Sequence, residues 1–218
     1  RRGSKGVLNK NLRELHGKPL MAYTIERALE SGLFEHMVVS TDSDRIAETA
    51  KSFGAEAWFL RPTELATDEA PKLPVIRHVL VEAENYYDRQ FDVIVDLDVT
   101  SPLRNVGDIN GAYQQFLDEN ADILITGCPA RKNPYFNMVE KVNGRTRIVK
   151  EHDKLPTRRQ DAPQVFDVNA SIYIWKRHTL LESKTLLTDR TSLYVMPEER
   201  SMDIDTALDW EFVEYMIG

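Results

Sequence analysis

The chain has 218 residues and a formal net charge of -7, with 28 Lys or Arg against 35 Asp or Glu. This length predicts one domain that can bury a sizeable core. The acidic balance argues against broad nucleic-acid binding, and no apolar run approaches the roughly 20 residues of a membrane span. The single cysteine, Cys128, excludes an internal disulfide framework and fits a reducing compartment. We therefore expect a cytoplasmic protein with no nucleic-acid or membrane partner.

The first 18 residues differ from the rest because they hold six Lys or Arg and one acid. Glycines let backbone N–H groups turn toward a ligand, and lysines add positive charge, so this segment is a candidate site for a small anion. A solvated basic loop is the alternative reading of the charge. The chain opens inside this segment and not with Met, and we expect the first strand of the sheet to lie before it.

Helices and strands alternate through the first 126 residues, which is typical of a parallel α/β sheet. Apolar residues at helical spacing predict helices around Met21, Ile25 and Ala28; Ile46, Ala50 and Phe53; Val75, Val79 and Ala83; Ile109, Tyr113 and Phe116; and, near the end, Leu208, Phe212 and Met216. Short apolar runs predict buried strands at 37–40, 57–60, 91–95 and 123–126, and alternation predicts another at 165–175.

The regular alternation of helices and strands ends after Pro129. Residues 138–149 predict a β-hairpin that turns at Asn143-Gly144. We interpret residues 129–168 as an arm inserted between core strands, because the segment is short for an independent domain and long for a simple loop. Because an exposed arm of this kind often packs on a partner subunit, we expect it to be a dimerisation arm.

Two Asp-x-Asp pairs, Asp96/Asp98 and Asp203/Asp205, are candidates for a metal. Two carboxylates close together suit Mg²⁺, which retains waters and bridges to phosphate oxygens. A helix cap plus a surface acid is the plain alternative for the second pair. Together with the lysine-rich segment, either pair could hold a triphosphate between lysines and Mg²⁺. Enzymes that transfer nucleotidyl groups use this arrangement.

At this point the residues resemble a known family, the CMP-sialic acid synthetases (acylneuraminate cytidylyltransferases). The similar segments run in the family's order across nearly the whole chain: Arg1 to Gly6 with Lys10-Asn11, Arg61-Pro62 with Leu65 to Asp68, Thr100 to Arg104, Arg159-Gln160 with Asn169 to Tyr173, and Asp203 to Asp205 with Asp209-Trp210. The first and third segments, taken together, are specific for this family.

This resemblance implies a Rossmann-like α/β nucleotidyltransferase fold, with a mainly parallel sheet, helices on both faces and a small β-rich dimerisation arm. It implies that CTP activates a nine-carbon α-keto acid sugar, of sialic, legionaminic or pseudaminic type, as its CMP ester for cell-surface glycan synthesis. It also implies Mg²⁺ as cofactor and a homodimer.

Site residues follow from the same resemblance, position by position. The nucleotide set is Arg1, Gly3, Ser4, Lys5, Lys10, Asn11, Arg61, Ala70 and Lys72. The sugar set is Asp98, Ser101, Arg104, Arg159, Gln160, Phe166 and Asn169, partly with help from the partner subunit. The metal ligands are Asp203 and Asp205, and the expected catalytic residues are Arg1, Lys5 and Asp205; the general base is open between Asp205, Asp98 and a metal-bound water.

The chain departs from the family pattern at Arg2, where glycine is common, at Asp98-Val99, where Gln-Pro is usual, and at Ala170, where glycine is usual. The change at Asp98 favours a related bacterial nonulosonate over plain N-acetylneuraminic acid. The alternatives are a cytidylyltransferase for the eight-carbon keto-sugar acid (KDO type), a nucleotide-sugar glycosyltransferase with Asp96/Asp98 as its metal motif, and a non-enzymatic nucleotide-binding module.

Overall fold

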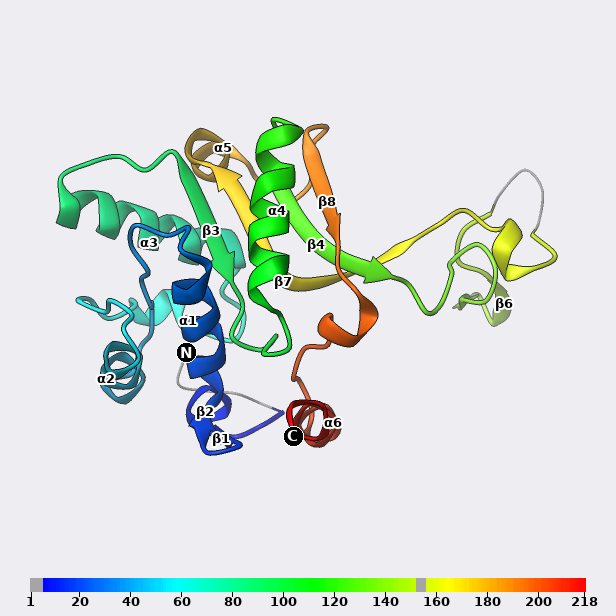
Figure 1. Cartoon of the computed structure of the whole chain (residues 1–218). Helices are drawn as coiled ribbons and strands as arrows, with labels where there is room; N and C mark the ends of the chain where they lie inside the picture. The colour runs from blue at the N-terminus through cyan, green and yellow to red at the C-terminus, as the bar shows by residue number, and fades with distance from the viewer. Residues whose placement is uncertain (1–5, 152–155) are drawn as a thin grey trace.

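The computed structural model describes residues 6–151 and 156–218. Its elements, labelled as in Figure 1 with η for 3-10 helices, are η1 (Lys10–Leu12), β1 (Glu14–Leu15), β2 (Lys18–Pro19), α1 (Leu20–Ser31), α2 (Asp44–Ser52), η2 (Thr63–Leu65), α3 (Lys72–Tyr87), β3 (Val93–Leu97), α4 (Val106–Asp118), β4 (Ile123–Pro129), β5 (Val139–Val142), β6 (Arg145–Ile148), η3 (Arg159–Asp161), β7 (Phe166–Lys176), α5 (Arg177–Glu182), β8 (Thr191–Val195), η4 (Glu198–Arg200) and α6 (Ala207–Ile217). No helix in these two ranges is both long enough and apolar enough to cross a membrane.

The central sheet has the strand order β3-β7-β4-β8. Strand β7 pairs antiparallel with both β3 and β4, whereas β4 and β8 are parallel. Three strands therefore share one direction and β7 runs against them, so the sheet is mixed where a mainly parallel one was expected. The reason is the connection: a parallel neighbour needs a crossover, but the chain between β4 and β7 leaves the sheet as an arm and returns (Figure 1).

Helices cover both faces of this sheet, as predicted. On one face α3 and α5 pack against Ile123 and Tyr173, and on the other face α4 packs against Leu124 and Ile174. The residues alternate between the faces because successive side chains of a strand point to opposite sides. In Figure 1, α4 crosses the front of the sheet and α3 and α5 lie behind it.

The predictions of short strands at 37–40 and 57–60 are wrong. The only strand-type pairing of this region within the described residues is a parallel bridge between Val38 and Glu56. The Val39 amide donates to the Glu56 carbonyl at 2.8 Å, and the Glu56 amide donates to the Met37 carbonyl at 2.7 Å. An apolar run predicts burial, but a strand forms only where a neighbour continues the ladder.

Helix α6 lies where the sequence predicted it, but with the opposite face buried. Leu208, Phe212 and Met216, whose spacing predicted the helix, are 74%, 44% and 42% exposed. Trp210 and Val213 are buried instead, in a cluster that joins α6 to the first part of the chain. The helix begins with a capping box, in which the Thr206 and Asp209 side chains each accept from the other's backbone N–H.

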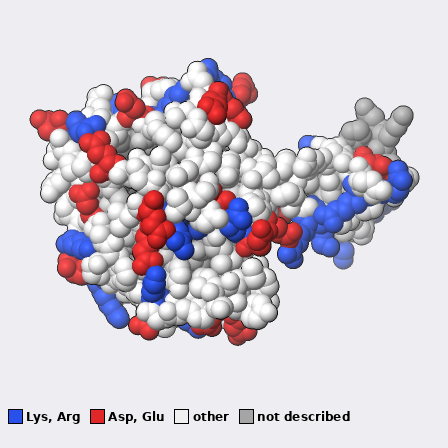
Figure 2. All heavy atoms as spheres, in the orientation of Figure 1, with Lys and Arg blue, Asp and Glu red and all other residues white. Residues whose placement is uncertain are grey.

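We call residues 129–168 the arm, and Figure 1 shows it projecting from one side of the sheet. Its hairpin joins β5 to β6 through Asn143 and Gly144, both at positive φ (51° and 78°), as the turn signal predicted. The arm holds nine Lys or Arg against five Asp or Glu in a chain whose net charge is -7. In Figure 2 the basic side chains follow the lower edge of the arm.

Strand β7 is irregular at the point where it meets β3 and β4. Its register against β4 shifts between Ile125 and Gly127, and Ala170 in the shifted segment has φ 53°. A side chain in this left-handed conformation costs roughly 1–2 kcal/mol because its Cβ crowds the following carbonyl. This is the position where the resemblance described above leads us to expect glycine.

We therefore expect Ala170→Gly to raise the free energy of unfolding by about 0.5 kcal/mol. Relief of the strain exceeds the roughly 0.4–1 kcal/mol by which glycine stabilises the unfolded chain through entropy. Urea denaturation measures this change. Ala162→Gly is the control, because Ala162 has φ -80° and the same substitution there brings only the entropic loss; equal losses at both positions would contradict the assignment of strain.

Candidate active site

A groove of about 730 Å³ opens between the first part of the chain, α3 and the end of β3. Several predicted site residues line it together, namely Lys10, Asn11, Arg61, Ala70, Lys72, Asp98 and Asp205. They come from segments up to 195 positions apart. Because β3 ends at this groove, the site lies at the carboxyl end of an outer strand of the four-stranded sheet, and ligands bind beyond the carboxyl ends of strands in open α/β sheets.

The basic N-terminal segment meets the Asp203–Asp205 segment at one end of the groove. Lys10 Nζ lies 3.3 Å from Asp205 Oδ1 and also donates to the Ile204 carbonyl. A Cβ at Gly6 would come within 1.8 Å of the Asp205 carbonyl oxygen, so only glycine allows this close approach. The predicted residues Arg1, Gly3, Ser4 and Lys5 lie outside the described residues.

Asp203 and Asp205 form a pair of carboxylates whose charge is only partly compensated. Burial raises the pKa of Asp203 above its ordinary value, and the charge of Asp205 raises it further. The Asp205 side chain is 71% exposed and lines the groove, whereas the side chain of its partner Lys10 is only 12% exposed. Among the described residues, no three His, Cys, Asp or Glu side chains form a metal-binding cluster. Two carboxylates are enough for a divalent cation that takes its other ligands from phosphates and water, so this donor pair fits one.

The second Asp-x-Asp pair already has a cation from the protein. Lys72 Nζ lies 2.7 Å from Asp96 Oδ2 and 3.6 Å from Asp98 Oδ2. Burial acts to raise the pKa of Asp98, but the Lys72 charge and hydrogen bonds from Thr100 outweigh it and hold this pKa below its ordinary value. Asp96/Asp98 is therefore the pair on which two cations of the protein act, because the charge of Arg104 also lowers the pKa of Asp98.

Arg104 is a predicted sugar residue, and the structure places it inside the protein, 1% exposed. Its Nη1 donates to the carbonyls of Ser171 (2.6 Å) and Asp98 (3.2 Å), and its Nη2 donates to Thr24 Oγ1 at 2.9 Å. Burial lowers the pKa of Arg104 to about 10, although Asp98 and other acids oppose this shift. In this chain Arg104 joins α1, the end of β3 and the irregular part of β7, and its terminal nitrogens are used within the protein.

Two other predicted sugar residues are also buried beneath the site. Asn169 is 6% exposed and accepts from Thr126 Oγ1 at 2.7 Å, while its Nδ2 donates to Ser201 Oγ at 3.0 Å. Ser101 is 1% exposed, and its hydroxyl finds no partner within the part of the chain that the structure describes. Asn169 thus links β4, β7 and the segment before Asp203.

The predicted sugar residues of the arm do not line the groove. Arg159 and Gln160 lie in η3, and the Arg159 side chain donates to the Ala130 carbonyl at 3.0 Å. Phe166 is the first residue of β7, at the base of the arm. The fold of one chain therefore separates these three residues from Asp98 and Asp205.

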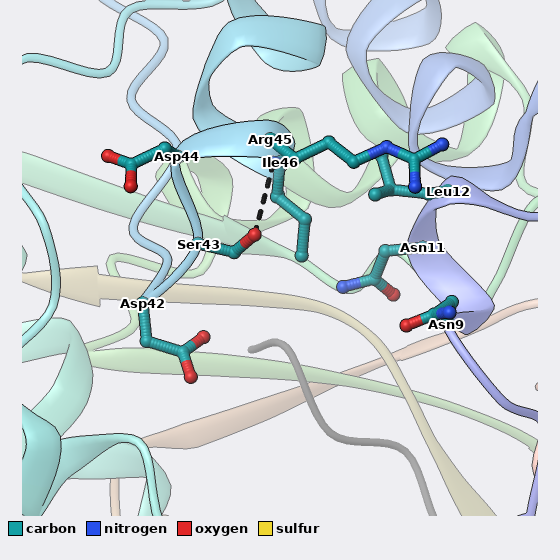
Figure 3. Close-up of a pocket in the computed structure, with 8 residues that line it drawn as sticks. All are labelled: Asn9, Asn11, Leu12, Asp42, Ser43, Asp44, Arg45 and Ile46. Carbon is teal, nitrogen blue, oxygen red and sulfur yellow. Dashed lines mark hydrogen bonds between the residues drawn. The ribbon is translucent and has the colours of Figure 1, made fainter.

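A smaller cavity of about 370 Å³ adjoins the groove, and Asn11 and Ile46 line both. Figure 3 shows the Asn11 amide pointing into the space between η1 and the start of α2. On the groove side, Arg61 is held by Ser40, to whose carbonyl its Nη2 donates at 2.6 Å. Asn11 thus borders both spaces, and Arg61 lines the larger one.

Sequence reasoning missed the contacts that hold the site loops together. Arg200 makes two bonds to Asp108, at 2.9 and 3.0 Å, and Asp108 caps the start of α4 directly after the Thr100–Arg104 loop. The Ile204 amide donates to the Thr100 carbonyl at 2.9 Å. Residues 92 positions apart leave no local signal for such a pair.

Comparisons with known proteins find similar sequences and folds that match almost the whole chain. A family model described as Cytidylyltransferase matches residues 1–213. The chain is 46% identical over 218 residues to a CMP-N,N'-diacetyllegionaminic acid synthase of Campylobacter jejuni, and 44% identical over 217 residues to a post-translational flagellin modification protein B of Campylobacter coli; each match covers 100% of this chain and 92% of the relative.

Among solved structures, a CMP:2-keto-3-deoxy-manno-octonic acid synthetase complexed with CTP superposes with a TM-score of 0.69 at 18% identity, covering 99% of this chain and 94% of the other. This likeness establishes the fold. The match over residues 1–213 and the identity to full-length relatives establish the family. The chain belongs to the cytidylyltransferase family and is a nucleotidyltransferase.

Proposed function

We propose that this enzyme transfers the CMP group of CTP to a nonulosonate, a nine-carbon α-keto acid sugar of legionaminic type. The observation that carries the proposal is the single groove that collects Lys10, Asn11, Arg61, Asp98 and Asp205. The legionaminic relative at 46% identity supports this sugar class. Membership in the cytidylyltransferase family leaves the glycosyltransferase and the non-enzymatic binding module without support.

In the proposed reaction, the anomeric hydroxyl of the sugar attacks the α-phosphorus of CTP and pyrophosphate leaves. Lys10, with Arg1 and Lys5 as carried over from the family, would hold the phosphates, while Asn11, Arg61 and Ala70 would line the nucleoside end. Asp203 and Asp205 would hold Mg²⁺, which neutralises charge on the phosphate oxygens when bound. Asp205 and Asp98 both remain candidates for accepting the proton of the sugar hydroxyl.

We further propose that the enzyme works as a homodimer in which the arm completes the sugar site of a second copy. Arg159, Gln160 and Phe166 lie away from the groove of their own chain. The arm exposes Met138, Val139, Val149 and Val168, which are 42–61% exposed. Its excess of basic residues complements the acidic remainder of a second copy.

Removal of the arm hairpin tests the dimer. The Val149 amide donates to the Met138 carbonyl at 3.1 Å, so residues 139–148 can be replaced by a Gly-Ser link without pulling on the base of the hairpin. We expect a monomer that still binds CTP but loses most of its turnover. Sedimentation equilibrium at micromolar concentration measures the change, and a wild-type protein that is already monomeric would refute the dimer.

The function itself is tested by CTP-dependent release of pyrophosphate with a panel of sugar acids. We expect N,N'-diacetyllegionaminic acid to give the highest kcat/KM, with N-acetylneuraminic acid and pseudaminic acid lower. Release only with the eight-carbon keto-sugar acid would favour the KDO-type alternative. Release with none of these acids would contradict the proposal. A reaction without added sugar corrects for simple CTP hydrolysis.

We expect the enzyme to act in the cytoplasm. The one cysteine, Cys128, is buried and free, so no disulfide among the described residues requires an oxidising compartment.

A further inference from the structure

Lys72 begins helix α3 and is surrounded by groups that hold its ammonium in place. Its Nζ contacts Asp96 Oδ2 at 2.7 Å and Asp98 Oδ2 at 3.6 Å, and it lies 4.2 Å from the centre of the Tyr173 ring. The Lys72 side chain is 30% exposed, and it lines the groove together with both acids. The ammonium is therefore directed toward the two carboxylates and the ring face.

Asp98 is fixed from the other side as well. Its Oδ1 accepts hydrogen bonds from the Thr100 amide and the Thr100 hydroxyl, both at 3.0 Å, while its Oδ2 faces Lys72. Its backbone amide donates to the Ser171 carbonyl at 3.1 Å, which ties it to β7. The carboxylate therefore has one orientation at the wall of the groove.

The charge of this carboxylate decides what it can bind. An ionised carboxylate only accepts hydrogen bonds, and it repels the carboxylate of a sugar acid and the phosphates of CTP. It attracts hydroxyl and amide N–H groups. A nonulosonate of legionaminic type carries both kinds of donor on its carbon chain, away from its own carboxylate.

We propose that Lys72 is a positioning residue for sugar recognition, and that it holds Asp98 as an oriented acceptor for a hydroxyl or acylamino N–H of the sugar. This inference rests on the function proposed above and changes one assignment in it, because the resemblance placed Lys72 with the nucleotide. Without Lys72, Asp96 and Asp98 face one another as like charges, so Asp98 must turn away or take up a proton. Either change removes the acceptor from the groove.

The test compares the wild type with Lys72→Met and Lys72→Arg in steady-state kinetics with CTP and N,N'-diacetyllegionaminic acid. We expect Lys72→Met to raise KM for the sugar at least tenfold and to leave KM for CTP within twofold, and Lys72→Arg to recover part of the loss. Lys51→Met removes an exposed lysine that pairs with Glu48, and we expect it to change neither constant. The double variant Lys72→Met/Asp98→Asn should be no worse for the sugar than the poorer single variant, because the two residues act through one contact.

Calorimetry provides a readout that does not depend on turnover. We expect Lys72→Met to bind CTP like the wild type and, in the presence of CMP, to bind the sugar acid at least tenfold more weakly. Weaker CTP binding with normal sugar binding would overturn the proposal, as would fully additive effects in the double variant. A wild type that binds the sugar acid in this Lys72-dependent way but releases no pyrophosphate would contradict the proposed function and leave the role of Lys72 standing. Circular dichroism confirms that each variant is folded.

Discussion

Asp203→Asn and Asp205→Asn should each lower Mg²⁺-dependent turnover by at least roughly 10²–10³-fold, as expected for the loss of a group that stabilises charge in the transition state. Burial and the charge of Asp205 raise the pKa of Asp203, and Lys10 contacts Asp205 at 3.3 Å. One lysine compensates only part of the charge of two carboxylates. Magnesium titrations of the initial rate measure the effect. An independent readout is the Mg²⁺-induced shift in Tm, which each substitution should remove.

Asp98→Asn is the matched control for this experiment. Asp98 already faces Lys72, so we expect this variant to keep its magnesium response and to show a higher KM for the sugar. A lost ligand weakens the transition state, whereas a lost sugar contact mainly weakens ground-state binding. A variant Asp98→Asn that loses its metal response, together with an Asp203→Asn that keeps it, would place the ion on the other pair.

Arg104→Met should destabilise the protein by about 3–5 kcal/mol, which is the usual cost of removing one partner from a buried charged network. The substitution leaves the Ser171 and Asp98 carbonyls and the Thr24 hydroxyl without their donor. Lysine at this position keeps the charge but not the planar fork, so Arg104→Lys should recover only part of the loss. Urea denaturation gives these free energies of unfolding.

Arg131→Met is the control for the loss of an arginine. The Arg131 side chain is 75% exposed and pairs with Glu198 at the surface, where an ion pair contributes about 0–1 kcal/mol. If Arg104→Met costs no more than this control, the internal network is not what holds the Thr100–Arg104 loop. A large loss of stability would support Arg104 as a structural residue beneath the site.

Local patterns were enough to predict most of the elements. Helices α1, α2, α3 and α4 and strands β3, β4 and β7 all occur where apolar periodicity placed them, because burial of one face or of both faces leaves a period in the sequence. The turn at Asn143-Gly144 was predictable for the same kind of reason, since its backbone needs positive φ at both positions. Strand β8 and helix α5 were missed, as their short segments carry little periodicity.

The sequence by itself determined the residue types of the site and their order, and through them the family. Only the tertiary structure decided which of these residues face the groove. Arg104 and Asn169 lie inside the protein, Lys72 pairs with Asp96 and Asp98, and α6 buries the face opposite to the one its spacing suggested. The physical reason is that each of these outcomes depends on contacts between distant segments. Periodicity and motif spacing describe what a segment can bury or bind, whereas its neighbours in the folded chain decide which of its side chains are already satisfied.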